Sequence, residues 1–130
     1  MWSVLLMPEC QAWLDRLPAA DRVGILQDAK LLQEFGPQLG RPHVDTMKGS
    51  RHANLKELRS RHAGHQYRTL FAFDPKQRAI LLLGGDKVGQ DEKRFYGALI
   101  KQADALYDRH LLQIEREQAR ERRENQGRKP

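Results

Sequence analysis

The chain has 130 residues, of which 39% are hydrophobic and 31% charged, and a formal net charge of +6. This length fits one domain with a modest core, the single cysteine (Cys10) excludes an internal disulfide, and the sequence contains no apolar run long enough to cross a membrane. No signal peptide is evident, so we expect a soluble cytoplasmic protein with no membrane partner, whose basic charge favours nucleic acid as the partner.

The N-terminal third predicts one strand and two helices. Residues 2–7 (WSVLLM) form a short apolar run ended by Pro8, which is typical of a strand buried on both faces. The spacing of apolar residues then predicts a helix over 9–17, interrupted by Pro18, and a second helix that starts after Pro18 and runs to about Phe35, where Gly36-Pro37 is a stop signal. These two helices form a helical hairpin.

The central part changes to a strand pattern. Glycines and prolines in 36–54 predict a long irregular connection with a short extended piece at 44–48. Two strands, 55–61 and 66–73, flank a turn at 62–65, and after a second turn the apolar run 79–84 predicts a strand ended by Gly84-Gly85. Strands that follow helices in this way predict an α+β fold with a small, mainly antiparallel sheet.

A last helix begins after residues 86–91, with an apolar stripe that runs from Tyr96 to Ile114. Beyond Ile114 the stripe stops and acidic and basic residues alternate. We therefore place the domain at 1–114 and interpret 115–130 as a charged tail, either a solvated helical extension or a disordered segment.

The positive charge is concentrated in residues 41–68. This segment holds seven basic residues against two acidic ones, a net of +5, and four of the five histidines. A basic surface formed there would attract phosphates, and the histidines would exchange protons near neutral pH. The alternative is a solvated loop with ordinary surface charge.

A tight turn at 62–65 fixes the register of the two strands around it. Arg59 then lies opposite Arg68, and Glu57 shares their face of the sheet. Two facing arginines repel each other unless an anion lies between them, and a phosphate between the two guanidinium groups would serve. The alternative is that each arginine pairs with Glu57 or another carboxylate.

The ordered set of motifs resembles a known family. Asn54-Leu55-Lys56-Glu57-Leu58-Arg59, a short turn, Tyr67-Arg68 and Leu70-Phe71-Ala72-Phe73 are similar to the core of the RelE/HigB toxins of type II toxin–antitoxin systems, in their phage-derived Gp49-like branch. Ile80–Leu83 and Gly85-Asp86-Lys87 continue the resemblance, which covers residues 2–112. It implies a RelE-like fold, with an N-terminal strand and a helical hairpin on the sheet and a C-terminal helix.

The resemblance also implies an activity and partners. Such toxins are ribosome-dependent endoribonucleases that bind in the ribosomal A site and cut messenger RNA by attack of a 2′-hydroxyl, without a metal or another cofactor. A cognate helix-turn-helix antitoxin neutralises them, and the toxin–antitoxin complex binds operator DNA through the antitoxin.

Several site residues follow from the resemblance. Arg59 and Arg68 would bind phosphate and stabilise charge, and Lys87 would stabilise charge or donate a proton. Glu57 is either a weak base or a group that orients the guanidiniums. RNA binding is assigned to Lys48, Lys56, Arg61, His52 and Tyr96, with Phe95 as the alternative to Tyr96 for stacking on a base and His52 as a second candidate for proton transfer. No histidine–carboxylate spacing indicates a metal site.

Two other functions compete with this interpretation. A ParE-like toxin of related fold acts on DNA gyrase through protein contacts and would use the arginines for folding and partner binding. A plain RNA-binding module would expose aromatic side chains on a sheet face, but Tyr67, Phe71 and Phe73 lie on the face that the helical hairpin is expected to cover.

Overall fold

The computed structural model describes residues 2–127 and has a five-stranded sheet in the order β1-β5-β4-β3-β2. The β1 strand is parallel to β5, and the other neighbouring strands are antiparallel. In chain order the elements are β1 (Ser3–Leu6), α1 (Pro8–Asp15), α2 (Ala19–Phe35), the short 3-10 helix η1 (Gly36–Gln38), β2 (Val44–Thr46), β3 (Lys56–His62), β4 (His65–Phe73), β5 (Arg78–Asp86) and α3 (Glu92–Gly127). The predicted RelE-like α+β fold is confirmed.

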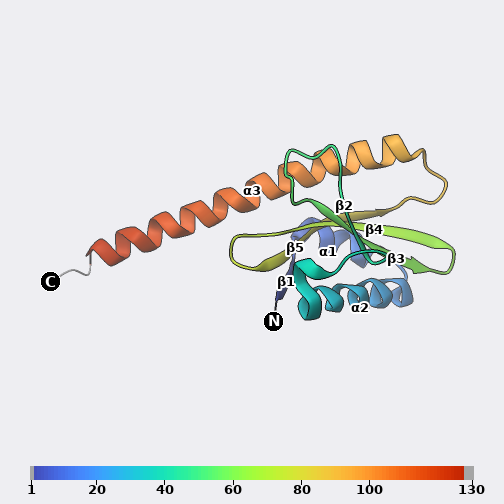
Figure 1. Ribbon diagram of the computed structural model, residues 1–130, viewed down its shortest axis with the longest axis horizontal. Helices are drawn as coiled ribbons and strands as arrows, with labels where there is room; N and C mark the ends of the chain where they lie inside the picture. The colour runs from blue at the N-terminus through green and yellow to red at the C-terminus, as the bar shows by residue number, and fades with distance from the viewer. Residues whose placement is uncertain (1, 128–130) are drawn as a thin grey trace.

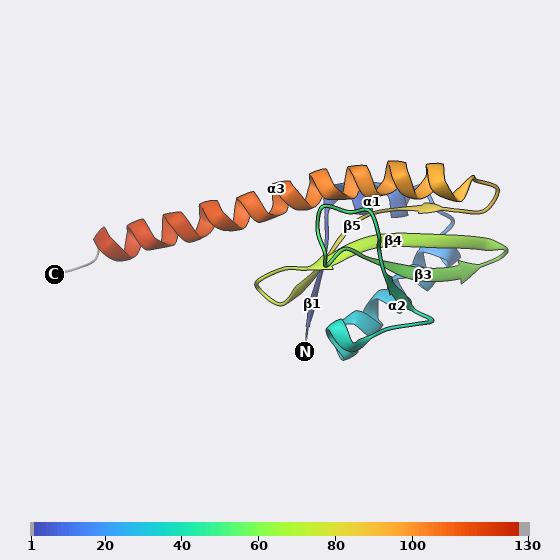
Figure 2. The ribbon, with the colours of Figure 1, turned by 45° about the horizontal axis from the view of Figure 1, so that its top comes forward.

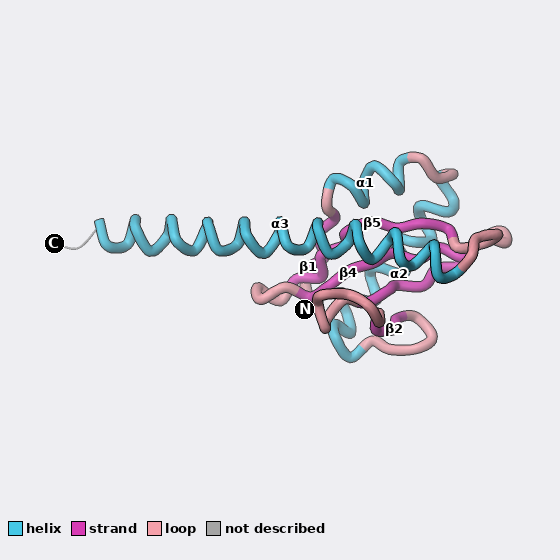
Figure 3. The backbone as a smooth tube through the Cα atoms, turned by 90° about the horizontal axis from the view of Figure 1, so that it is seen from above, coloured by secondary structure: helices cyan, strands magenta, loops and turns pink. Residues whose placement is uncertain are grey.

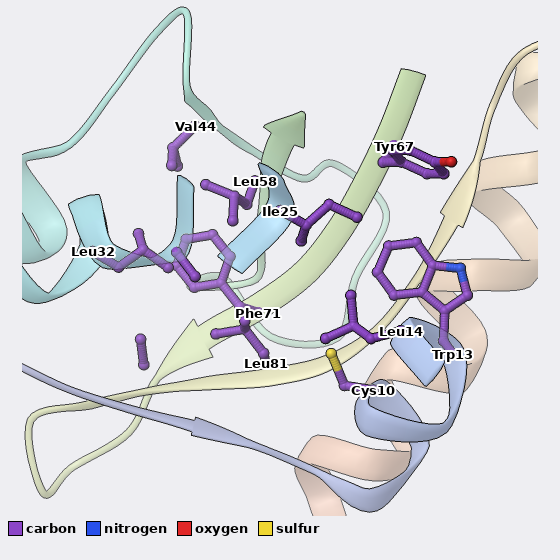
Figure 4. Close-up of a cluster of buried hydrophobic side chains, with 12 residues drawn as sticks. Cys10, Trp13, Leu14, Ile25, Leu32, Val44, Leu58, Tyr67, Phe71 and Leu81 are labelled. Atoms are coloured by element: carbon purple, nitrogen blue, oxygen red, sulfur yellow. The ribbon is translucent and has the colours of Figure 1, made fainter. Parts of the chain in front are cut away.

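Helices cover both faces of the sheet (Figures 1 and 2), with α2 below it and α3 above it in these views. The α1 and α2 helices bury one face through a core that contains Trp13, Leu14, Ile25 and Phe71 (Figure 4). Cys10 lies in this core, and burial raises the pKa of its thiol to about 12. The thiol is therefore uncharged and inert at neutral pH.

The second face packs against the first half of α3. Leu70 and Leu82 from the sheet, together with Leu55 just before β3, pack with a stripe of α3 that includes Leu99 and Tyr107. Because this face carries the two arginines as well, α3 encloses part of the surface on which the sequence predicts the site.

The register predicted for β3 and β4 is confirmed. Arg59 pairs with Arg68, and the ladder continues to His62 opposite His65. The turn itself is shorter than predicted and consists of Ala63 and Gly64, which both have positive φ angles, 48° and 83°. Two such residues form the kind of turn that joins antiparallel strands most tightly.

The prediction that the first strand is buried on both faces is wrong. Its side chains alternate between exposed and half-buried, and Leu5 is 43% exposed. The physical reason is that β1 lies at the edge of the sheet, where the helices cover it incompletely. The apolar run predicts a strand, but it does not specify an edge.

The predicted end of the last strand at Gly84-Gly85 is also wrong, since β5 continues to Asp86. The two glycines permit close packing instead of a turn. A Cβ atom on Gly84 would lie 2.3 Å from the Trp13 ring, and one on Gly85 would lie 2.9 Å from the Phe95 ring.

We therefore expect Gly84→Ala to lower the free energy of unfolding by about 1–3 kcal/mol, because the added methyl group must displace the Trp13 ring. Urea unfolding measures this loss. The matched control is Gly40→Ala, where an added Cβ would meet no atom within 4 Å, and its stability should not change. Equal stability of both variants would contradict the packing role of Gly84.

The α3 helix runs well past the sheet (Figure 3). Residues 115–127 continue it without a break, so this part of the predicted tail is a helical extension, while 128–130 lie outside the described residues. Its link to the body is an exposed ion pair, 3.4 Å between Lys76 Nζ and Glu117 Oε2. None of the helices in residues 2–127 is both long and apolar enough to span a bilayer.

Deleting residues 115–130 should change the melting temperature by less than about 4 °C, because in its described part, residues 115–127, no apolar residue is buried and one exposed ion pair links it to the body. Differential scanning calorimetry of the full and shortened chains tests this. A large loss of stability would show that the domain does not end at Ile114.

Candidate functional site

The two facing arginines differ sharply in exposure. The Arg68 side chain is only 4% exposed and that of Arg59 is 35% exposed, while Glu57 beside them is 1% exposed. All three project from β3 and β4 toward α3, since residues paired across a ladder share a face. The partly exposed guanidinium of Arg59 therefore lies over the buried ion pair of Glu57 and Arg68.

The anion between the arginines is the carboxylate of Glu57. Its Oε1 accepts a hydrogen bond from Arg59 Nε at 2.9 Å and lies 3.8 Å from Arg68 Nε. The chain thus relieves the repulsion between its own arginines, and pairing with Glu57 is the arrangement that the structure adopts. This pairing favours the orienting role of Glu57 over that of a base.

Tyr96 covers this ion pair from α3. Burial raises the pKa of its hydroxyl to about 12, and the negative charge of Glu57 acts in the same direction. Glu57 Oε2 and Arg68 Nε have no hydrogen-bond partner within residues 2–127. We call Glu57, Arg59, Arg68 and Tyr96 the glutamate–arginine cluster.

Asp45 holds the open side of Arg59. Its Oδ2 lies 3.3 Å from an Arg59 terminal nitrogen and 2.9 Å from one of Arg41. The hydrogen bond from Arg41 lowers the pKa of the Asp45 carboxyl, and the charge of Arg59 adds to this effect. The Arg59 guanidinium is therefore fixed between two carboxylates before any ligand arrives.

Lys87 lies next to the cluster in the connection from β5 to α3. Its Nζ is 2.8 Å from Glu92 Oε1, and this contact lowers the pKa of Glu92, with a further contribution from the charge of Arg68. The structure therefore brings Lys87 and Glu92 into the neighbourhood of the buried arginine.

Other predicted site residues lie elsewhere. Lys56 pairs with Phe71, so its side chain lies on the face of the sheet opposite Arg59 and Arg68. Arg61 is exposed near the β3–β4 turn. His52 contacts Asp108 at 2.7 Å, which is twelve residues and about 18 Å along α3 from Tyr96. His52 therefore lies apart from the arginines.

The aromatic residue at the site is Tyr96, because Phe95 is 7% exposed and packs in the core. Within residues 2–127, no three histidine, cysteine, aspartate or glutamate side chains gather closely enough to hold a metal ion.

A basic groove adjoins the cluster. Of the residues that line it, only Lys48 and Tyr96 were predicted from the sequence to bind RNA. It has a volume of about 760 Å³ and lies between the loop after β2 and the first turns of α3. Its lining includes Tyr96, Gly97 and Ile100 and the basic residues Lys48, Arg51, Lys93 and Lys101. The spacing of Lys93, Gly97 and Lys101 at every fourth position is a signal in the sequence that could have revealed it.

The fold and the site define a small α+β protein of the RelE-like class, with an ion cluster between its sheet and its last helix. Residues 12–108 match the family described as phage derived protein Gp49-like (DUF891). Because the match covers more than half of the chain, the protein belongs to the Gp49-like family.

Two relatives from Mycobacterium tuberculosis (strain ATCC 25618 / H37Rv) are similar over most of the chain. Identity to "Putative toxin HigB2" is 41% over 117 residues, which is 89% of this chain and 58% of that protein. Identity to "Putative toxin HigB3" is 45% over 102 residues, 78% of this chain and 87% of that protein. The chain thus spans less than two thirds of the length of the first relative. The predicted resemblance to the HigB branch is confirmed.

Proposed function

We propose that the protein is the toxin of a type II toxin–antitoxin system and acts as a ribosome-dependent messenger RNA endoribonuclease. The observation that carries this proposal is the pair of fixed cations, Arg59 and Lys87, arranged around the buried Glu57–Arg68 ion pair beside a basic groove. Preorganised cations of this kind stabilise the charge that develops on a phosphate during cleavage. The names of the two relatives support the assignment as a toxin.

The proposed reaction is an internal transfer within the RNA. The 2′-hydroxyl oxygen loses its proton and bonds to the adjacent phosphorus, while the bond from phosphorus to the 5′-oxygen breaks and that oxygen takes up a proton. The products are a 2′,3′-cyclic phosphate and a 5′-hydroxyl. One proton leaves and one is added, so the step consumes no water.

The exposure of each residue suggests its role. Arg59, the more accessible guanidinium, and Lys87 would contact the phosphate, whereas Arg68 and Glu57 are positioning residues because both are buried. Tyr96 would stack on a base beside the cut. We propose no catalytic part for Lys56, Arg61 or His52. Lys56 lies on the opposite face of the sheet, Arg61 shares the face of Arg59 but is exposed beside the turn, and His52 pairs with Asp108.

The partners proposed for the chain are a cognate helix-turn-helix antitoxin, the ribosomal A site with its messenger, and operator DNA bound through the antitoxin. All of them would be met in the cytoplasm.

The test is to induce the protein without its antitoxin and map messenger ends by primer extension, with and without an inhibitor of translation initiation. Cleavage that disappears when translation stops supports the proposal. Intact messengers accompanied by gyrase inhibition would favour the ParE-like alternative, in which the arginines serve partner binding.

A variant of Lys87 tests the chemistry separately from the fold. Lys87→Ala should reduce cleavage about 10²-fold, since it removes a charge beside the phosphate, yet it breaks an exposed ion pair that contributes little to stability. Glu92→Gln is the matched control, because it breaks the same pair and keeps the ammonium group. Wild-type cleavage by Lys87→Ala would remove Lys87 from the mechanism.

A further inference from the structure

We propose that the basic groove between residues 48–51 and α3 binds the single-stranded RNA nucleotides that flank the cut phosphate. This inference rests on the proposed function and adds the path that the substrate takes across the protein. The groove begins at Tyr96, which belongs both to its lining and to the glutamate–arginine cluster. An RNA strand leaving the cluster would therefore enter the groove directly.

The groove presents cations that have no partner in the protein. Lys48, Lys93 and Lys101 are exposed, and none of them pairs with a carboxylate in the part of the chain that the structure describes. Its two acidic residues, by contrast, are occupied. Glu92 pairs with Lys87, and Asp104 accepts hydrogen bonds from the loop. The net effect is a groove with an excess of unpaired positive charge, which suits phosphates.

Gly97 is a second, independent observation. It lies within α3, where a glycine costs about 1 kcal/mol relative to alanine, and a Cβ atom there would meet no other atom within 4 Å. Packing inside the protein therefore does not require the glycine. Its missing side chain leaves an open floor between Tyr96 and Ile100, onto which a planar base can lie.

The dimensions of the groove suit a short piece of RNA. Lys93 and Lys101 are eight residues apart on the helix, which corresponds to about 12 Å. A stacked strand advances about 3.4 Å per phosphate, so this distance matches three or four nucleotides. The two lysines would then contact phosphates at the two ends of that piece.

The opposite wall is held in place by the helix itself, beside which it lies in Figure 2. Ser50 Oγ donates to Asp104 Oδ1 at 2.5 Å, and the backbone nitrogen of Arg51 donates to Oδ2 at 3.0 Å. Asp104 is only 4% exposed, so these hydrogen bonds are shielded from water. The groove is therefore preformed, and RNA binding need not order the loop.

An acidic peptide is the other polyanion that such a groove attracts. RNA fits better, because a flat floor made of an aromatic ring and a glycine suits a base, and the groove opens onto the proposed cleavage site. The test therefore measures both ligands.

The experiment compares variants of the full chain for binding of a short fluorescent single-stranded RNA and, in a parallel titration, of a fluorescent polyglutamate peptide. Gly97→Leu fills the floor and should weaken RNA binding about 10-fold without loss of stability, whereas Gly97→Ala should bind like the wild type and melt higher. The double variant Lys93→Glu/Lys101→Glu should also weaken binding at least 10-fold and flatten its salt dependence. The double variant Arg22→Glu/Lys30→Glu on α2, which changes the net charge by the same amount, is the control for net charge.

Wild-type RNA affinity in both Gly97→Leu and the double lysine variant would overturn the inference. If the same variants lose affinity for the acidic peptide, the groove is a peptide site. Cleavage is measured separately, so RNA binding in the groove by a protein that cuts no messenger would refute the proposed function and leave the groove assignment standing.

Discussion

Replacing Arg68 with alanine is expected to reduce both stability and toxicity. The substitution leaves the carboxylate of Glu57, which is 1% exposed, without its buried partner. Removing one member of a buried ion pair typically costs about 3–5 kcal/mol of unfolding free energy. Cleavage should fall about 10²-fold or more, because Glu57 loses the partner that holds it in place to orient the Arg59 guanidinium.

A double variant separates these two effects. Arg68→Met/Glu57→Leu removes both buried charges and fills the space with apolar side chains, so most of the lost stability should return. Toxicity should not return, since Arg59 has lost the carboxylate that accepts its Nε hydrogen. Urea unfolding and growth after induction provide the two measurements. A stable double variant that still arrests growth would show that the buried pair serves folding alone.

The β3–β4 hairpin could be predicted at the level of individual pairs. Alternation of side chains and a turn that supplies a glycine fix the register, so Arg59 opposite Arg68 follows from local rules. These rules act between residues that are close in sequence. The same holds for the helical hairpin, whose ends are marked by prolines and a glycine.

The burial of the site could not be predicted in the same way. Arg68 is covered by Tyr96, a residue 28 positions further along the chain, and no local pattern specifies where the last helix crosses the sheet. For the same reason Gly84 and Gly85 resemble a turn in the sequence. Only the positions of Trp13 and Phe95 show that they are points of close packing.

The candidate site was predicted in part, for a related reason. The basic residues of 41–68 are close together in the sequence and can be recognised there as a charge cluster. The groove, by contrast, combines Lys48 and Arg51 with lysines of a helix that is distant in sequence. Which carboxylate each cation prefers is also a tertiary property. Glu57 and Asp45 both hold Arg59, and Glu92 holds Lys87. Sequence spacing alone does not rank such pairs.

Substitution of Asp74, which lies outside the candidate site, is expected to have a large effect on stability. Its buried carboxylate caps the turn from β4 to β5, where Oδ1 accepts hydrogen bonds from the backbone nitrogens of Lys76 and Arg78 at 2.9 and 3.0 Å. Its Oδ2 lies 2.8 Å from an Arg78 side-chain nitrogen and 2.9 Å from His110 Nε2 on α3. Asp74 therefore ties the turn to the last helix.

The ionised form of Asp74 should stabilise the fold in a pH-dependent way. Burial by itself raises the pKa of this carboxyl, but the hydrogen bonds from His110 and Arg78 outweigh burial, and the pKa lies below its ordinary value of 3.8. A carboxyl whose pKa is lower in the folded than in the unfolded chain contributes stability above the unfolded pKa. That contribution is lost as the pH falls through the folded pKa.

Asp74→Asn should therefore cost about 3 kcal/mol of unfolding free energy at neutral pH, because one amide cannot accept all of these hydrogen bonds or neutralise Arg78. As the pH falls below the unfolded pKa and through the still lower folded pKa of Asp74, the wild type loses this contribution, so the difference between the two proteins should shrink. Urea unfolding at a series of pH values measures this difference. The exposed Asp15→Asn is the matched control and should follow the wild type at every pH, since the hydrogen bond that Asp15 accepts from Gln11 is exposed. A difference between Asp74→Asn and the wild type that stays constant as the pH is lowered would show that the carboxylate charge is not what stabilises the turn.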